Sequence, residues 1–110
     1  MAAKFEIYKD KAGEFRFRLK AGNGENILAS EGYKAKSSCK NGIESVRKNS
    51  ADKKRFEVSK TRAGKFKFNL KASNGQVVGT SQSYATEASC ENGVACVKKD
   101  APKAVVEDKS

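Results

Sequence analysis

Residues 15–24 read Phe-Arg-Phe-Arg-Leu-Lys-Ala-Gly-Asn-Gly, and residues 66–75 repeat this pattern as Phe-Lys-Phe-Asn-Leu-Lys-Ala-Ser-Asn-Gly. In both stretches apolar residues alternate with polar or basic ones, which is typical of a β-strand with one buried and one solvent-facing side. We therefore expect the Phe and Leu side chains to face the core and the basic side chains to face solvent. The Asn-Gly that ends each stretch predicts a type I′ hairpin turn.

The repeat extends over most of the chain. With an offset of 51 residues, which pairs Phe5 with Phe56, about twenty positions between residues 5 and 52 are identical in the two copies. Internal duplication explains this agreement, so the two halves should share one fold. Each half then reads β-β-β-α-β, with the segment around Val105-Val106 as a short closing strand and a similar strand predicted just before Phe56. The predicted strands cover residues 5–9, 15–20, 26–30, 56–60, 66–71 and 77–81.

The spacing of apolar residues changes after Tyr33 and Tyr84. Cys39, Gly42, Ile43 and Val46 fall at positions i, i+3, i+4 and i+7, which is one stripe of an amphipathic helix, and the second half repeats the stripe. Ser37 and Thr86 are candidate N-caps, and the helices should end near residues 49 and 100. Because glycine is unfavourable inside a helix, we interpret Gly42 and Gly93 as positions where the helix backbone closes on the sheet.

The chain has 110 residues and a formal net charge of +10, with 37% hydrophobic and 33% charged residues. This composition is typical of a small globular protein with a packed core. We predict one α+β domain over residues 1–110, with one repeat at about 4–54, a second at about 55–106, and a frayed tail at 107–110. The two units should join in one mainly antiparallel sheet, with the helices packed on one face.

The residue types present disfavour several classes of chemistry. The chain contains no histidine, which removes the Ser-His and Cys-His nucleophile pairs and the commonest metal ligand. The three cysteines do not form a Cys-x-x-Cys pair, so neither a disulfide framework nor a zinc site is indicated. We expect no cofactor, no metal and no enzymatic activity. No stretch is apolar enough for a signal peptide or a membrane span, so a cytoplasmic protein is expected.

The repeated motifs resemble those of the YegP-like family of small bacterial proteins, a domain of unknown function. The shared features are the Phe-x-Phe-x-Leu-Lys-Ala-x-Asn-Gly stretch, the Ser30-Glu31-Gly32-Tyr33 junction, and Asn-Gly-Ile/Val-x-x-Val in the helix. The second copy departs at the junction, where the Glu and the Gly are missing. The resemblance implies two units that exchange their C-terminal strands, and a chain that closes as a monomer. It implies no activity, cofactor or catalytic residue.

Three functions remain for this sequence. The first is a non-enzymatic binding or accessory module whose partner is unknown. The second is binding of nucleic acid or another polyanion on the outer face of the sheet, where Tyr8 is available to stack on a base. The residues proposed for polyanion binding are Arg16, Arg18, Lys20, Lys65, Lys67 and Lys71. We favour a simpler explanation of the same residues, a solvated face that keeps the sheet soluble and suppresses edge pairing.

The third function is a thiol-based enzyme, and it depends on one cysteine. Cys96 is the only cysteine without a counterpart in the other copy, since Ser45 takes its place. It lies off the apolar stripe, and the nearby Lys98 and Lys99 would favour its thiolate. Cys39 and Cys90 lie on the stripe and should be buried in the core. A cysteine that is merely tolerated at position 96 explains the sequence better.

Overall fold

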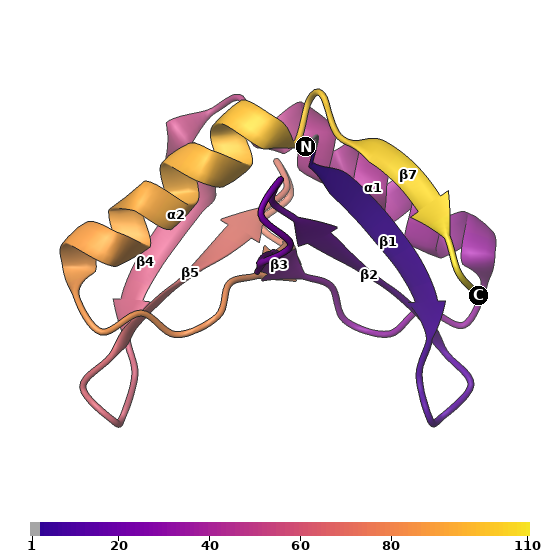
Figure 1. Ribbon diagram of the computed structural model, residues 1–110, viewed down its shortest axis with the longest axis horizontal. Coiled ribbons are helices and arrows are strands. Elements are labelled where there is room, and N and C mark those ends of the chain that lie inside the picture. The colour runs from indigo at the N-terminus through magenta and orange to yellow at the C-terminus, as the bar shows by residue number, and fades with distance from the viewer. Residues whose placement is uncertain (1–2) are drawn as a thin grey trace.

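The computed structural model, which describes residues 3–110, is one seven-stranded mixed sheet with two helices on one side (Figure 1). The order of strands across the sheet is β4-β5-β6-β3-β2-β1-β7. The predicted α+β class and duplicated architecture are therefore confirmed. The elements are β1 (Lys4–Lys9), β2 (Phe15–Lys20), β3 (Asn26–Ala29), α1 (Lys36–Asn49), the 3-10 turn η1 (Lys53–Arg55), β4 (Phe56–Lys60), β5 (Phe66–Lys71), β6 (Val77–Thr80), α2 (Glu87–Asp100) and β7 (Val105–Asp108).

The two repeats meet at the centre of the sheet, where β3 and β6 pair antiparallel through Ala29 and Thr80. Each repeat contributes an antiparallel three-stranded meander, and Figure 1 shows the two halves in a nearly two-fold arrangement around this junction. β7 then crosses from the second repeat and pairs in parallel with β1 of the first. The C-terminal strand of the second repeat is thus exchanged onto the first repeat, as the family resemblance implied.

The exchange runs in one direction only. The strand predicted before Phe56 is not formed, because Lys53–Arg55 make a 3-10 turn capped by the Asp52 side chain, which accepts a hydrogen bond from the Lys54 N–H. The counterparts of Val105 and Val106 at this place are Lys54 and Arg55, which offer no apolar side chain to cover a sheet edge. The predicted frayed tail is also wrong in part, since Glu107 and Asp108 belong to β7.

The core lies between the sheet and the helices, as predicted from the alternation of apolar and polar residues in the strands. Phe17 and Leu19 of β2 are fully buried, as are Phe68 and Leu70 of β5. Phe17 contacts Phe5 edge to face at a ring distance of 5.9 Å, and the corresponding pair in the second repeat has the same geometry. The predicted orientation of the two quoted stretches is therefore confirmed, and their basic side chains lie on the face away from the helices.

Two local predictions were wrong. The N-cap of α1 is Ala35, which has no capping side chain, whereas Thr86 caps α2 as expected by accepting from the Ser89 N–H. The Asn-Gly turns are not type I′, because only the glycine has positive φ. In the first repeat the Gly24 N–H donates to the carbonyl of Ala21 at 2.9 Å, which is a type I turn followed by a glycine in the left-handed region.

The helix glycines have the predicted role. A Cβ atom on Gly42 would lie 2.6 Å from Tyr33 Oη and 2.9 Å from Phe17 Cε2, and Gly93 is equally close to Tyr84. Tyr33 stacks on Phe17, so the helix backbone rests directly on an aromatic pair. Glycine at these positions lets the helix lie close to the sheet, and any larger residue would push the two apart.

We expect Gly42→Ala to lower the free energy of unfolding by about 1 kcal/mol, even though alanine has the higher helix propensity, because overpacking outweighs that gain. Chemical denaturation of the variant and the parent measures the difference. A stabilised variant would contradict the close approach. Lys40→Ala, at an exposed position of the same helix, is the control and should change stability little.

Candidate strand-binding edge

A buried carboxylate anchors the outer face of β1. The Glu6 side chain is 1% exposed and is surrounded by Arg18 at 2.9 Å, Lys109 at 3.2 Å, and Lys20 and Lys4, both at 3.4 Å. Burial alone would raise the pKa of Glu6, but the ion pairs outweigh it and lower the pKa to about 2. Glu6 is therefore an anion at neutral pH, and it holds four cations against the sheet.

The first repeat binds β7 through charge pairs on both faces of the sheet. On the outer face Lys4 Nζ donates to Glu107 at 2.9 Å, and on the helix face Lys36 Nζ donates to Asp108 at 2.9 Å. The carbonyl of Ala104, just before the strand, accepts a hydrogen bond from Arg47 of α1 at 2.6 Å. These contacts define what a strand needs in order to dock beside β1.

The equivalent edge of the second repeat is open. Within residues 3–110, β4 pairs with β5 alone and is the last strand of the sheet. Phe56 and Val58 are only partly buried, whereas their counterparts Phe5 and Ile7 are completely buried. Glu57, the counterpart of Glu6, has a side chain that is 58% exposed. The edge thus presents half-covered apolar side chains at the place where the other repeat holds a strand.

The backbone of this edge also faces outward. Val58 lies directly opposite Phe68, and the Phe68 N–H donates to Ser81 Oγ on the other side of β5. In an antiparallel ladder, opposite residues either exchange both hydrogen bonds or neither, so the N–H and C=O of Val58 point away from β5. In the first repeat the corresponding carbonyl, that of Ile7, accepts from the Lys109 N–H at 2.8 Å. At β4 this bonding capacity is unused.

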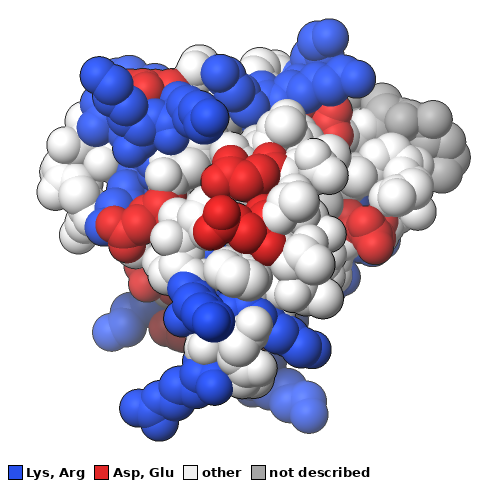
Figure 2. All heavy atoms as spheres, turned by 90° about the vertical axis from the view of Figure 1, so that its left-hand side faces the viewer, with Lys and Arg blue, Asp and Glu red and all other residues white. Residues whose placement is uncertain are grey.

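The charge on this side of the molecule differs from that around β7. Glu57 on β4 and Glu87 and Glu91 on α2 are all exposed. Figure 2, which views the side that carries α2 and β4, shows acidic side chains gathered in the middle of the face, between basic groups at its upper and lower ends. A net charge of +10 for the whole chain hides this acidic area.

Most of the residues predicted to bind a polyanion are engaged by carboxylates. Arg16 pairs with Asp10 at 2.6 Å and Lys71 with Glu57 at 2.9 Å, while Arg18 and Lys20 surround Glu6. Within residues 3–110 only two of the six make no ion pair, and both belong to the second repeat. They are Lys65 and Lys67. The predicted basic face therefore carries ion pairs over most of its area but stays net positive, because four cations share the single carboxylate of Glu6.

The aromatic part of that hypothesis changes as well. The guanidinium of Arg18 covers the ring of Tyr8 at 4.4 Å from the ring centroid. A base that stacked on Tyr8 would have to displace this cation–π contact and loosen the Arg18–Glu6 pair. Polyanion binding at these residues stays a prediction.

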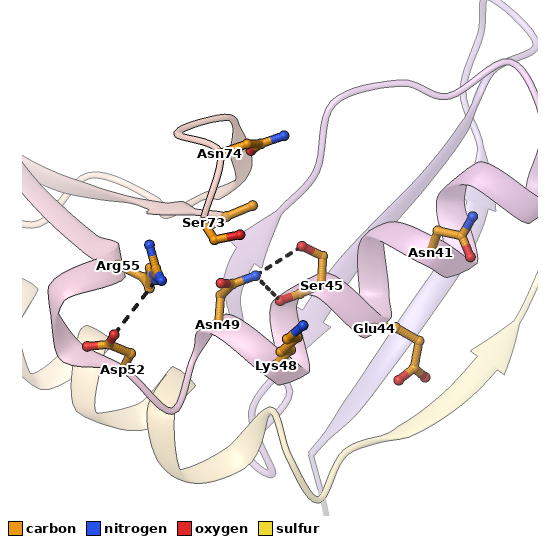
Figure 3. Close-up of a pocket in the computed structure, with 10 residues that line it drawn as sticks. Asn41, Glu44, Ser45, Lys48, Asn49, Asp52, Arg55, Ser73 and Asn74 are labelled. Carbon is orange, nitrogen blue, oxygen red and sulfur yellow. Dashed lines mark hydrogen bonds and ion pairs between the residues drawn. The ribbon is translucent and has the colours of Figure 1, made fainter.

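A polar groove of about 550 Å³ lies between the end of α1, η1 and the β5–β6 turn (Figure 3). Asn49 donates to both the carbonyl and the hydroxyl of Ser45, and Arg55 pairs with Asp52 at 3.7 Å. These polar groups satisfy one another. The ten residues that line the groove include no cysteine or histidine, and they comprise two acidic and two basic side chains.

The cysteines divide as predicted. Cys39 and Cys90 are buried in the core, and Cys96 is exposed. Burial raises the pKa of Cys39 to about 11, with a smaller contribution from Asp108, so this thiol is inert at neutral pH. In the described part of the chain no group of cysteine and acidic side chains is arranged to hold a metal ion. No helix in that part is long and apolar enough to cross a membrane.

These features define a duplicated α+β protein with one closed and one open sheet edge, and comparison with known proteins agrees with the duplication. The family described as "Domain of unknown function (DUF1508)" matches residues 10–57 and again residues 62–108. The chain therefore belongs to this family. It is 65% identical to the UPF0339 protein in the ptx operon 5' region of Stutzerimonas stutzeri, over 96% of both chains, and 51% identical to the UPF0339 protein YegP of Escherichia coli K12, over 98% of both.

Two solved structures share the fold. The solution structure of yegP from E. coli, described as a protein of unknown function, has a TM-score of 0.93 at 50% identity and covers 99% of this chain and 94% of its own. That of UPF0339 protein SO3888 from Shewanella oneidensis has a TM-score of 0.91 at 42% identity, with 98% and 92% covered. The relatives are uncharacterised proteins, so any activity must be argued from the molecule itself.

Sequence reasoning missed the open edge of β4. A signal was present, since the second repeat lacks an apolar pair before Phe56 equivalent to Val105-Val106. Lys54 and Arg55 by themselves indicate that the segment before β4 does not cover a sheet edge as β7 covers β1. The assumption that both repeats have identical elements concealed this difference.

Proposed function

We propose that the chain is a small non-enzymatic binding module that holds an extended polypeptide segment along the outer edge of β4 by strand addition. The observation that carries this proposal is the contrast between the two repeats. β1 is covered by β7, whereas β4 presents an outward-facing backbone and the half-buried side chains of Phe56 and Val58. Strand addition supplies affinity through backbone hydrogen bonds and specificity through alternate side chains.

The proposal also accounts for the duplication. Both repeats lie in one chain and β7 closes the first of them intramolecularly, so a monomer is sufficient for the fold and leaves one edge for a partner. We propose that the protein works as a monomer in the cytoplasm. Polyanion binding has less support, because carboxylates hold four of the six basic residues proposed for it.

Hydrogen exchange tests the free edge first. In the free protein the Val58 amide should exchange at least about tenfold faster than the Ile7 amide, because β7 lies beside Ile7 and nothing pairs with Val58. The amides of Glu57 and Ser59 face β5 and serve as internal controls, since they should be protected like those of β1.

Selection of random decapeptides on the immobilised full chain then tests strand addition without an assumption about partner sequence. Selected peptides should protect the amides of Val58 and Lys60 and leave those of Lys4–Lys9 unchanged; the Phe56 amide already donates to the Lys53 carbonyl and should change little. Equal exchange at Val58 and Ile7 in the free protein, or selected peptides that bind elsewhere, would overturn the proposal.

A further inference from the structure

The residue that receives the end of a docked strand has opposite charge in the two repeats. In the first repeat Lys36, at the start of α1, binds Asp108 of β7 at 2.9 Å. Fifty-one positions further, the first residue of α2 is Glu87. A strand docked beside β4 in the manner of β7 would therefore bring its final inward-facing side chain to a carboxylate instead of an ammonium group.

The register of β7 fixes which side chain this is. β7 runs parallel to β1 with Val106 beside Phe5 and Asp108 beside Ile7. Since paired residues point to the same face, Val106 and Asp108 face the helix side, and Val106 lies against α1 near Ile43. Transferred to the second repeat, the two inward positions lie beside Phe56 and Val58.

The helix surface above these positions continues the acidic character. Lys40 and Val106 line the same surface groove on the first repeat, and the counterpart of Lys40 in α2 is the exposed Glu91. By the correspondence with Lys36 and Lys40, the partner positions beside β4 are flanked by Glu87 and Glu91. Opposite charge at such a contact favours binding and suppresses wrong partners.

We propose that the segment bound at β4 runs parallel to it and carries an apolar residue beside Phe56 and, two residues later, a lysine or arginine that pairs with Glu87. This inference rests on the proposed function and adds the direction and chemistry of the partner. A second copy's β7 has the apolar residue but places Asp108 against Glu87. The same charge that selects a basic segment therefore disfavours exchange of β7 between copies.

A pair of octapeptides tests the charge rule. One has the sequence of residues 103–110, and the other is identical except for Asp108→Lys. Each is titrated into the full-length labelled protein, and the amide signals of Phe56–Lys60 are followed by NMR. We expect the Asp108→Lys peptide to bind at least about fivefold more tightly, since an attractive pair replaces a repulsive one at a partly exposed site.

Charge reversal in the protein gives the decisive comparison. In Glu87→Lys protein the preference should invert, so that the peptide with Asp108 binds more tightly. Glu31→Lys is the matched control, because it makes the same change in net charge at an exposed residue beside the central strands β3 and β6. It should leave the preference of the parent protein unchanged.

The outcomes separate the two proposals. If both peptides bind at β4 with equal affinity, or if Glu87→Lys does not invert the order, the charge rule is overturned while strand addition stands. If neither peptide shifts the β4 amides at millimolar concentration, and selection also returns no peptide for this edge, both proposals fall. Shifts confined to Lys4–Lys9 would show that the peptides replace β7, which also contradicts the assignment.

Discussion

Glu6→Gln is expected to lower the free energy of unfolding by about 2 kcal/mol. Glutamine keeps the shape of the side chain but removes the charge, so four cations remain close together without their shared counterion. The loss is smaller than for a fully enclosed ion pair, because the cations are partly solvated. Urea denaturation at neutral pH measures it.

Glu57→Gln is the matched control for this change. Glu57 has the same position in the second repeat, but it is largely exposed and has one partner, Lys71. We expect its replacement to alter stability by less than about 0.5 kcal/mol. Equal losses for the two variants would show that the Glu6 cluster adds nothing beyond a surface ion pair.

The same pair of proteins has a defined pH dependence. Folding lowers the pKa of Glu6 from 4.5 to about 2, so its stabilisation is complete above pH 4.5 and is lost as the pH falls toward 2. The difference in stability between the parent and Glu6→Gln should therefore shrink across this window. Carboxylates remote from the cluster contribute equally to both proteins and cancel in the difference, whereas Glu107, which shares Lys4 and Lys109 with Glu6, does not cancel fully.

Ile7→Ala is expected to cost about 3 kcal/mol of unfolding free energy, the amount typical of a large aliphatic side chain removed from a closed core. Ile7 is completely buried beneath α1 and beside β7. Its counterpart Val58 occupies the same position beside the open edge and is only half-buried. Val58→Ala should therefore cost about 1 kcal/mol.

Part of this contrast comes from the extra methylene of isoleucine, which accounts for about 1 kcal/mol. The variant Ile7→Val corrects for it. The loss of unfolding free energy from Ile7→Val to Ile7→Ala is then compared with the loss for Val58→Ala, and the difference measures how much β7 stabilises position 7. Thermal or urea unfolding of the three variants and the parent supplies the values. If, after this correction, both alanine variants lost the same unfolding free energy, we would conclude that Val58 on β4 is as well buried as Ile7 on β1, against the prediction.

The sequence predicted those parts of the fold that depend on local periodicity. The alternation in residues 15–20 and 66–71 placed Phe17 and Phe68 in the core, and the helical stripe placed Cys39 and Cys90 beneath the helices. The glycines at 42 and 93 indicated the close helix–sheet approach, because a residue unfavourable in a helix needs a reason in packing. Each of these inferences used residues within one element.

What the sequence did not reveal depends on contacts between elements. The ion pairs of Arg16, Arg18 and Lys20 could not be inferred, because their partners Asp10 and Glu6 lie in a hairpin or on another strand. The strand before β4 was predicted because the second repeat was assumed to match the first. It is not formed, and the sequence already differs there, since Lys54 and Arg55 stand at the positions that correspond to Val105 and Val106. Ion pairs and strand pairing depend on neighbours that are distant in the sequence, whereas the burial of a side chain could be predicted from the periodicity of its own element.

The crossover of β7 also sets an order of events during synthesis. Lys4 and Glu107 are 103 positions apart in the chain and yet share a hydrogen bond at the edge of the sheet. The first repeat to leave the ribosome therefore cannot seal its own core until the last residues emerge, while its β1 edge stays exposed. The second repeat has no such dependence, because in residues 3–110 no strand docks on the outer edge of β4, so the docking of β7 on β1 becomes the late, long-range step.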